Sequence, residues 1–273
     1  MEALFLKLAA VFYLIGTGSF ILYLILPKKL TAQISLAVFL GGFALHTVAV
    51  SILFVRQGFP AVTEMRESLS FYGWLLGGVY LLAQIKYRLT ALGSVIAPLS
   101  FLLCFSAFAF GSSGGEVPPE LNTYWLPLHV TFAFLGNAVF ALAFGVSLIY
   151  LFQDHQLKTK RVPVLTKRFP SLETLDRLNC VFLVWGFPLM TLGILTGSLW
   201  AAVSWGNYWS WDPRQISSAI VWLLYGALIH GRFTAGLSGR KAALLTVVGF
   251  VVVLGYFLWG DALFPSRHAG KFD

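Results

Sequence analysis

The chain has 273 residues, which is enough for one large domain or two of ordinary size. Hydrophobic residues make up 58% of it and charged residues 11%, whereas a soluble domain is about 25% charged. The net charge of +8 comes from basic residues in short stretches between apolar runs, which argues against nucleic-acid binding. The composition therefore excludes a water-soluble globule and predicts an integral membrane protein.

Eight apolar stretches follow one another along the chain, and each is about long enough to cross a bilayer as a helix, which takes about 20 residues. They span residues 4–26, 34–55, 69–85, 91–111, 127–151, 179–200, 215–231 and 242–260. Because Lys28 and Lys29 stop the first stretch, we expect it to be retained rather than removed as a signal peptide. The expected fold is an all-α bundle of about eight transmembrane helices, a single polytopic domain over residues 1–273.

The basic residues set the expected orientation, because Lys and Arg accumulate in cytoplasmic loops. With the N-terminus outside, 13 of them lie inside and 6 outside, and the opposite orientation inverts this ratio. Eight crossings then return the C-terminus to the outer face. Segments 111–125, 200–215 and 264–270 share that face. The expected location is a bacterial inner membrane, with a thylakoid membrane as the second choice.

Residues 200–215, here called the tryptophan segment, are the strongest signal in the sequence. Four of the nine tryptophans fall within positions 200–211. An aromatic belt at the membrane interface is the structural alternative, but a belt places one or two aromatics at each helix end. A segment with almost half of the tryptophans favours an aromatic platform for a large planar ligand.

The local geometry of this segment can be predicted in two ways. If it were helical, Trp205, Tyr208, Trp209 and Asp212 would share one face. Asp212 followed by Pro213 predicts the N-cap and first position of the seventh helix. This structural role for Asp212 is favoured over a catalytic one.

Four histidines bear on the nature of the ligand. His129 lies at the outer end of the fifth stretch and His268 just beyond the eighth. Either one alone would be interpreted as an ordinary interfacial side chain. Two histidines on the same face beside an aromatic platform could instead be the two axial ligands of a haem iron. His46 and His230 lie inside membrane stretches, where an ionisable group is a functional candidate. The alternative for both is a neutral ring bonded to a neighbouring helix.

Arginines on the outer face could pair with haem propionates through bidentate contacts. They are Arg56, Arg66, Arg214 and Arg267. They could equally neutralise Glu64, Glu67 or lipid headgroups. Cys104 and Cys180 offer neither a CxxC redox pair nor metal-ligand spacing.

At these residues the sequence resembles the cytochrome c assembly proteins of the CcsA/ResC type, which are related to CcmC and CcmF. The run Trp205-Gly-Asn-Tyr-Trp-Ser-Trp-Asp-Pro213 is similar to their outward tryptophan-rich WWD motif almost residue for residue. Further similarities lie at 67–69, 128–158, 175–178 and 186–193. Two places depart from the family: Gln215 stands where an acidic residue is usual, and the tail around His268 is short.

The resemblance implies haem handling at the outer face. It makes His129 and His268 the axial ligands and His230 the ligand of an inner site. That inner site is completed by another histidine, often from a partner subunit, with His46 as the candidate in this chain. It also implies that the tryptophan segment binds haem, through Trp205, Tyr208, Trp209, Trp211, Asp212 and Arg214.

The function that the resemblance implies is that of a haem-handling subunit of a system II cytochrome c synthase. Such a subunit holds haem b transiently, in reduced form, and presents it to apocytochrome c for thioether formation. The implied partners are a CcsB/ResB-type membrane subunit and an apocytochrome with a CxxCH motif. This chain has no CxxCH motif, so it is not itself the cytochrome.

Two other functions stay open at this point. A haem-binding membrane regulator without synthase activity would tolerate loss of the outer histidines and the tryptophans, both of which are present. A membrane transporter would need a polar or broken helix along a path. Pro98 and Pro188 could kink two helices, but the intramembrane charges expected of such a path are missing from the sequence.

Overall fold

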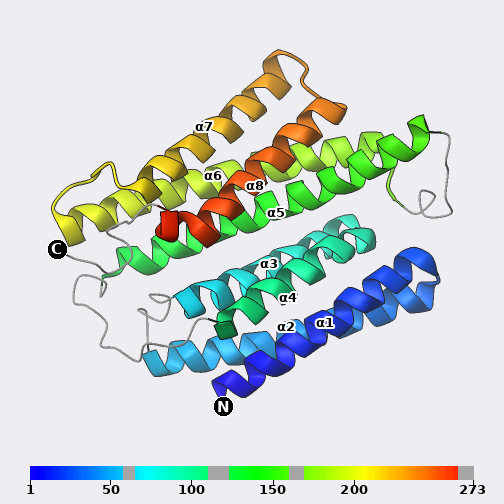
Figure 1. The fold of residues 1–273 in the computed structure, drawn as a ribbon, viewed down its shortest axis with the longest axis horizontal. Helices are drawn as coiled ribbons and strands as arrows, with labels where there is room; N and C mark the ends of the chain where they lie inside the picture. Colours follow the sequence, from blue (N-terminus) through cyan, green and yellow to red (C-terminus); the bar gives the residue numbers. More distant parts are fainter. Residues whose placement is uncertain (58–64, 110–122, 160–168, 264–273) are drawn as a thin grey trace. The chain divides into compact units, whose positions relative to one another are not determined.

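The computed structural model describes residues 1–57, 65–109, 123–159 and 169–263. Within these ranges the chain forms eight α-helices, one short 3-10 turn and no strand (Figure 1). The helices are α1 (Glu2–Ile25), α2 (Lys29–Gln57), α3 (Met65–Tyr87), α4 (Gly93–Ala109), α5 (Trp125–Lys158), α6 (Leu172–Trp205), α7 (Pro213–Thr234) and α8 (Gly239–Leu263). This confirms the predicted all-α fold and the order of the eight helices.

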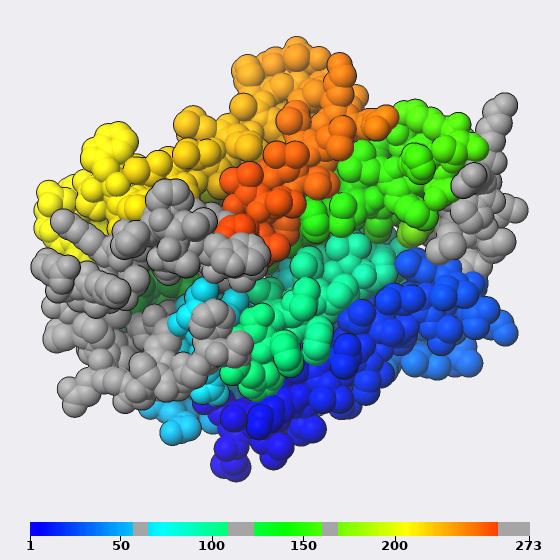
Figure 2. Space-filling view, viewed as in Figure 1, coloured from blue at the N-terminus to red at the C-terminus, as the bar shows by residue number. Residues whose placement is uncertain are grey.

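Helices α1 to α7 are long and apolar enough to cross a membrane. Their exposed surfaces are apolar: α1, the blue helix that lies open in Figure 2, has exposed Leu4, Val11 and Ile15. In water such a surface would drive association, whereas acyl chains solvate it without cost. The chain is therefore an integral membrane protein, as its composition predicts.

Contacts divide the chain into two units, Met1–Pro127 with Gln156–Pro170, and Leu128–His155 with Ser171–Asp273. In the first unit, α1 packs against both α2 and α4, and α3 packs against α4. Phe20, Phe39 and Tyr80 are fully buried there and meet edge to face. Gly93 leaves room for this cluster, since a Cβ at Gly93 would lie 2.4 Å from the Phe20 ring.

In the second unit, α5 and α6 run side by side at backbone contact (Figure 1). A Cβ at Gly136 would lie 2.8 Å from the backbone nitrogen of Met190, and one at Gly193 would lie 2.9 Å from that of Ala133. Small residues permit such close approach between membrane helices. Because residue numbers rise on one helix as they fall on the other, the two helices are antiparallel. This contact fixes the N-terminal part of α5 on the C-terminal part of α6.

A buried polar cluster connects the helices of this unit near the start of α6. The Asn179 amide donates to Ser147 Oγ on α5 at 2.7 Å and to Thr246 Oγ1 on α8 at 3.1 Å. Asp176 Oδ1 accepts from the Arg232 guanidinium on α7 at 2.9 Å and from the backbone nitrogen of Gly239 at 2.9 Å. Hydrogen bonds in a low-dielectric interior are strong when their partners are satisfied, so this cluster ties four helices together.

Candidate functional site

The tryptophan segment connects α6 and α7. Helix α6 ends at Trp205 because Gly206, with φ of 75°, adopts the left-handed conformation of a C-cap. Helix α7 begins at Pro213, and the Asp212 side chain accepts a hydrogen bond from Arg214 N at 2.9 Å. The predicted N-cap is confirmed. The helical face proposed for Trp205, Tyr208, Trp209 and Asp212 is wrong, because residues 206–212 are not helical.

The indoles of this segment form two pairs rather than one flat platform. Trp200 and Trp205 meet edge to face with ring centroids 4.8 Å apart. Trp209 and Trp211 meet at 89° with centroids 5.7 Å apart. Trp200 is buried, whereas Trp211 is 74% exposed. Aromatic pairs that meet edge to face leave ring faces and edges open to a third ring, which suits a planar ligand.

The indole of Trp209 is a donor without an acceptor within the described part of the chain. The indole Nε1 of Trp209 is buried and has no hydrogen-bond partner there. A buried polar atom without a partner costs stability and calls for an explanation, such as a bound ligand. This observation fits a ligand that carries hydrogen-bond acceptors, as the carboxylates of haem do.

The backbone of the segment is bent at Trp211. Its φ of 55° is in the left-handed region, which a bulky residue rarely adopts and which costs about 1–3 kcal/mol. Both neighbours of Trp211 are held by hydrogen bonds: Asp212 as the N-cap of α7, and Ser210 through Gln215. Ser210 donates from its backbone nitrogen at 2.8 Å and from its hydroxyl at 3.2 Å to Gln215 Oε1.

His129 lies in the same unit, on α5, and reaches α6. Its Nδ1 is 2.7 Å from the carbonyl oxygen of Gly193. Its ring is parallel to that of Trp200, with centroids 6.2 Å apart. Gly197 makes room for the ring, because a Cβ there would lie 2.6 Å from ring atoms Cε1 and Nδ1. The structure therefore brings His129 and the start of the tryptophan segment together.

This contact decides which nitrogen of the neutral His129 ring carries the hydrogen. A carbonyl oxygen only accepts, so Nδ1 must be the donor toward Gly193. Nε2 then carries the lone pair. Metal-binding histidines generally have this arrangement, with one ring nitrogen donating to a carbonyl while the other ligates the metal.

The other predicted site residues are placed differently. His46 is fully buried in the first unit, with Nδ1 3.3 Å from the Tyr13 hydroxyl and Nε2 3.1 Å from Ser70 Oγ. His230 is exposed near the end of α7, in the second unit. His268 lies outside the described residues.

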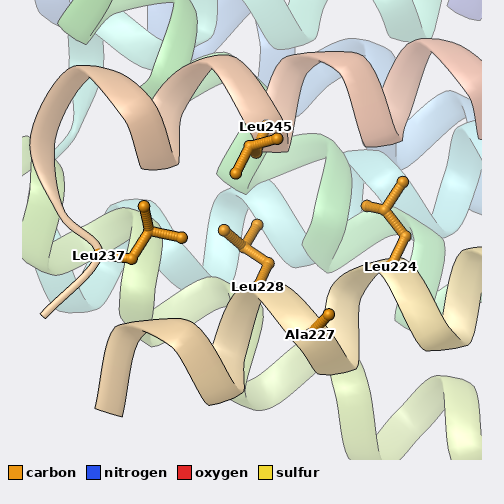
Figure 3. A pocket seen from close by; sticks show the side chains of 5 residues that line it. All are labelled: Leu224, Ala227, Leu228, Leu237 and Leu245. Carbon is orange, nitrogen blue, oxygen red and sulfur yellow. The ribbon is translucent and has the colours of Figure 1, made fainter. Parts of the chain in front are cut away.

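A hollow of about 230 Å³ lies between α7 and α8. It is lined by Leu224, Ala227, Leu228, Leu237 and Leu245 (Figure 3). These side chains are all apolar, so the hollow offers no ligating or hydrogen-bonding side chain of its own.

The arginines that were expected on the outer face also have distinct environments. Arg66 pairs with Glu2 at 3.1 Å, an ion pair that the sequence did not indicate. Arg56 is exposed, and Arg214 is half-buried in the first turn of α7, within the tryptophan segment. Arg267 and Glu64 lie outside the described residues.

Two features of the site were missed at the level of sequence. The first is the seat of His129, by which we mean the contact of its ring with Gly193 and Gly197 on α6. The sequence contains a signal for it, because these two glycines are one helical turn apart in the small-xxx-small pattern of close helix packing. The second is the hydrogen bond between Gln215 and Ser210, for which the sequence contains a weaker signal. A Gln at the third helical position commonly bonds back to the N-cap, whereas this one reaches two residues further.

Comparison with known proteins identifies the family. The model of the cytochrome c assembly protein family matches residues 62–260. The chain belongs to this family. The matched range contains His129, the tryptophan segment and His230. The family resemblance drawn from the tryptophan-rich run is thereby confirmed.

Family relatives match over most of the chain. The cytochrome c biogenesis protein CcsA of Guillardia theta is 32% identical over 97% of this chain and 88% of its own length. CcsA of Chlamydomonas reinhardtii is 33% identical over 80% of this chain and 65% of its own length. That of Microcystis aeruginosa is 30% identical over 84% of this chain and 85% of its own.

A solved structure shares the fold. The cytochrome c haem lyase CcmF superposes with a TM-score of 0.63 at 20% identity, over 99% of this chain. The chain spans half the length of that protein. The likeness supports the arrangement of the helices, and at this identity it supports the fold alone.

Proposed function

We propose that this protein holds haem at the outer face of the membrane and presents it to apocytochrome c for thioether attachment. Family membership gives it a role in cytochrome c maturation. The observation that carries the finer proposal is the position of the His129 ring: it stacks on Trp200, and its Nδ1 donates to the Gly193 carbonyl, which is the arrangement that metal-binding histidines generally show.

The tryptophan segment supports the same substrate. Trp200 stacks on His129 and contacts Trp205, so the candidate ligand and the aromatic rings belong to one local structure. Trp209, Trp211 and the exposed Tyr208 extend the aromatic surface around the connection. Arg214 within this segment is the candidate partner of a haem propionate.

The proposed reaction adds two cysteine thiols of a CxxCH motif across the two haem vinyl groups. Each sulfur–carbon bond forms as the thiol hydrogen passes to the other vinyl carbon, so no group leaves. The role of this chain is to orient haem so that the vinyl groups face the thiols, a contribution of proximity rather than of acid or base catalysis. His129 holds the iron until the histidine of the substrate motif replaces it.

The remaining parts of the proposal extend the family resemblance. His268 is the second axial ligand, and His230 belongs to an inner haem site. A CcsB/ResB-type subunit completes the synthase, and haem b is held transiently in the reduced state. The tryptophan segment faces the periplasm of a bacterium or the equivalent side of a thylakoid.

His46 fits a structural role better than an inner haem site. Both of its ring nitrogens are already within hydrogen-bond distance of hydroxyl groups on α1 and α3. An axial ligand needs one nitrogen available to the iron.

The test is the haem spectrum of the detergent-purified protein, alone and with its partner subunit, beside His129→Ala. We expect a six-coordinate low-spin haem that becomes high-spin or is lost in the variant. His155→Ala is the matched control, because His155 is an exposed histidine of the same helix. A spectrum unchanged by His129→Ala moves the site to His230. A native protein without haem, even with the partner, overturns the proposal and leaves the transporter, since the alternative regulator also binds haem.

A further inference from the structure

The bend at Trp211 leads to an inference about Gln215, which rests on the proposed function. Trp211 is bulky, 74% exposed and left-handed, so its position is not explained by burial of its indole. A strained backbone of this kind persists only where neighbouring contacts determine it, and it is often found at functional sites.

The contacts that determine it come from the first turn of α7. Asp212 is the N-cap, and Gln215 is the third residue of the helix. In an ordinary capping box the side chain at this third position bonds to the backbone N–H of the N-cap. Here it accepts from the backbone N–H and the hydroxyl of Ser210, two residues before the cap. Trp211 is the one residue between the two anchored points.

The hydrogen bonds on either side of Trp211 also determine how two indoles are oriented toward each other. Ser210 lies between Trp209 and Trp211, whose rings are 5.7 Å apart at 89°. Because Ser210 is hydrogen-bonded to Gln215 of α7, the backbone that carries the two indoles is held in one position. Without this hydrogen bond, residues 207–211 could relax to backbone conformations with negative φ, which L-residues prefer.

We propose that Gln215 is a positioning residue of the tryptophan segment, which holds the indole of Trp211 outward, at right angles to Trp209, against one edge of the haem. The position requires a hydrogen-bond acceptor on a two-methylene stem rather than a charge. A glutamate at this position would supply the same acceptor.

The first experiment measures hydrogen exchange at the Ser210 amide in the haem-free, full-length protein. Gln215→Leu keeps the size of the side chain and removes the acceptor, so exchange should become about fivefold to tenfold faster. Gln215→Glu should stay as protected as the native protein. Gln33→Leu, an exposed position on α2, is the matched control and should change nothing. Native protection in Gln215→Leu overturns the inference.

The second experiment measures the affinity for haem b added in detergent. Gln215→Leu and Trp211→Ala should weaken it by similar factors, and Gln215→Glu should restore it. Because Gln215 acts through Trp211, Gln215→Leu should cause no further loss in the Trp211→Ala background. Equal losses in both backgrounds overturn the inference. If the native protein binds no haem, the proposed function fails, while the exchange result still decides whether Gln215 anchors Ser210.

Discussion

At the scale of single residues, the seat of His129 depends on Gly197. A methyl group there would overlap ring atoms Cε1 and Nδ1 at 2.6 Å, and neighbouring Gly193 supplies the carbonyl that orients the ring. The absence of a side chain is therefore as specific a requirement as the presence of the imidazole. Neither glycine touches the iron in the proposed complex, yet both decide where the lone pair of Nε2 points.

We predict that Gly197→Ala displaces the His129 ring and breaks its bond to Gly193. The loss of one oriented hydrogen bond corresponds to about 1 kcal/mol, or roughly a fivefold weaker affinity for haem. Part of the low-spin spectrum should also become high-spin. Titration of haem into the purified variant measures both effects. Gly18→Ala is the control, because nothing lies within 4 Å of its added methyl group. An unchanged spectrum and affinity in Gly197→Ala would contradict the seat described for His129.

His46 leads to the opposite expectation for a buried histidine. Its replacement by Ala leaves the Tyr13 hydroxyl and Ser70 Oγ without this partner in a fully buried place. Each buried polar group deprived of its partner costs about 1–3 kcal/mol. We therefore predict a lower melting temperature for His46→Ala, with the haem spectrum of the native protein retained. Loss of haem at an unchanged melting temperature would show instead that His46 is a ligand.

At the scale of helices, Asp176 and Arg232 anchor the start of the α7–α8 connection to α6. The Arg232 side chain is 6% exposed and that of Asp176 is 24% exposed, so the pair lies away from bulk solvent. Asp176 also accepts from Gly239 at the beginning of α8. One carboxylate thus fixes the end of one helix and the beginning of the next.

We predict that Asp176→Ala destabilises the protein by about 3 kcal/mol, because it leaves a buried guanidinium without its counter-charge. Helix α6 has Asp176 near its first turn and Trp205 at its last residue, so the tryptophan segment is at the other end. Thermal unfolding should therefore shift while the haem spectrum stays native. Glu173→Ala, in the first turn of the same helix, is the control. A variant as stable as the native protein would contradict this role.

The same helices explain what could be predicted from sequence. The apolar stretches located all eight helices, since hydropathy marks the residues inside the hydrocarbon. They missed the ends of α5 and α6, which were expected at 127–151 and 179–200 but span Trp125–Lys158 and Leu172–Trp205. The turns added at the end of α5 and at the start of α6 contain charged and polar residues, and backbone hydrogen bonding continues there although hydropathy falls. Ser171, which caps α6, was the available signal for one of these ends.

In the candidate site, too, local features could be predicted from the sequence and tertiary contacts could not. The capping role of Asp212 follows from a local rule and is confirmed. The pairing of His129 with Gly193 joins residues 64 positions apart, and no local pattern specifies such a contact. The bend at Trp211 depends on a side chain reaching back past the N-cap, which is a tertiary choice among several acceptors.

At the scale of the whole molecule, the distribution of charge and the direction of the helices predict one orientation. Helices α5 and α6 are antiparallel, so the exposed His155 near the end of α5 and the tryptophan segment after α6 are at opposite ends of this pair. The stretch from Ala133 to His155 rises about 33 Å, which is enough to cross a hydrocarbon core of about 30 Å. We therefore expect the two ends to meet different compartments, and the 13 basic residues expected inside predict a cytoplasmic His155.

We predict that a cysteine at the exposed Tyr208 reacts with a membrane-impermeant maleimide in intact cells, whereas one at His155 reacts only after the membrane is opened. Each variant is made with Cys104 and Cys180 replaced by Ala, and that cysteine-free protein is the control for unspecific labelling. Tyr208 is 64% exposed, so its replacement should be accessible without rearrangement. Because thioether attachment needs haem, thiols and the tryptophan segment in one compartment, the reverse labelling pattern would refute delivery at the outer face. It would do so even if His129 proved to bind haem.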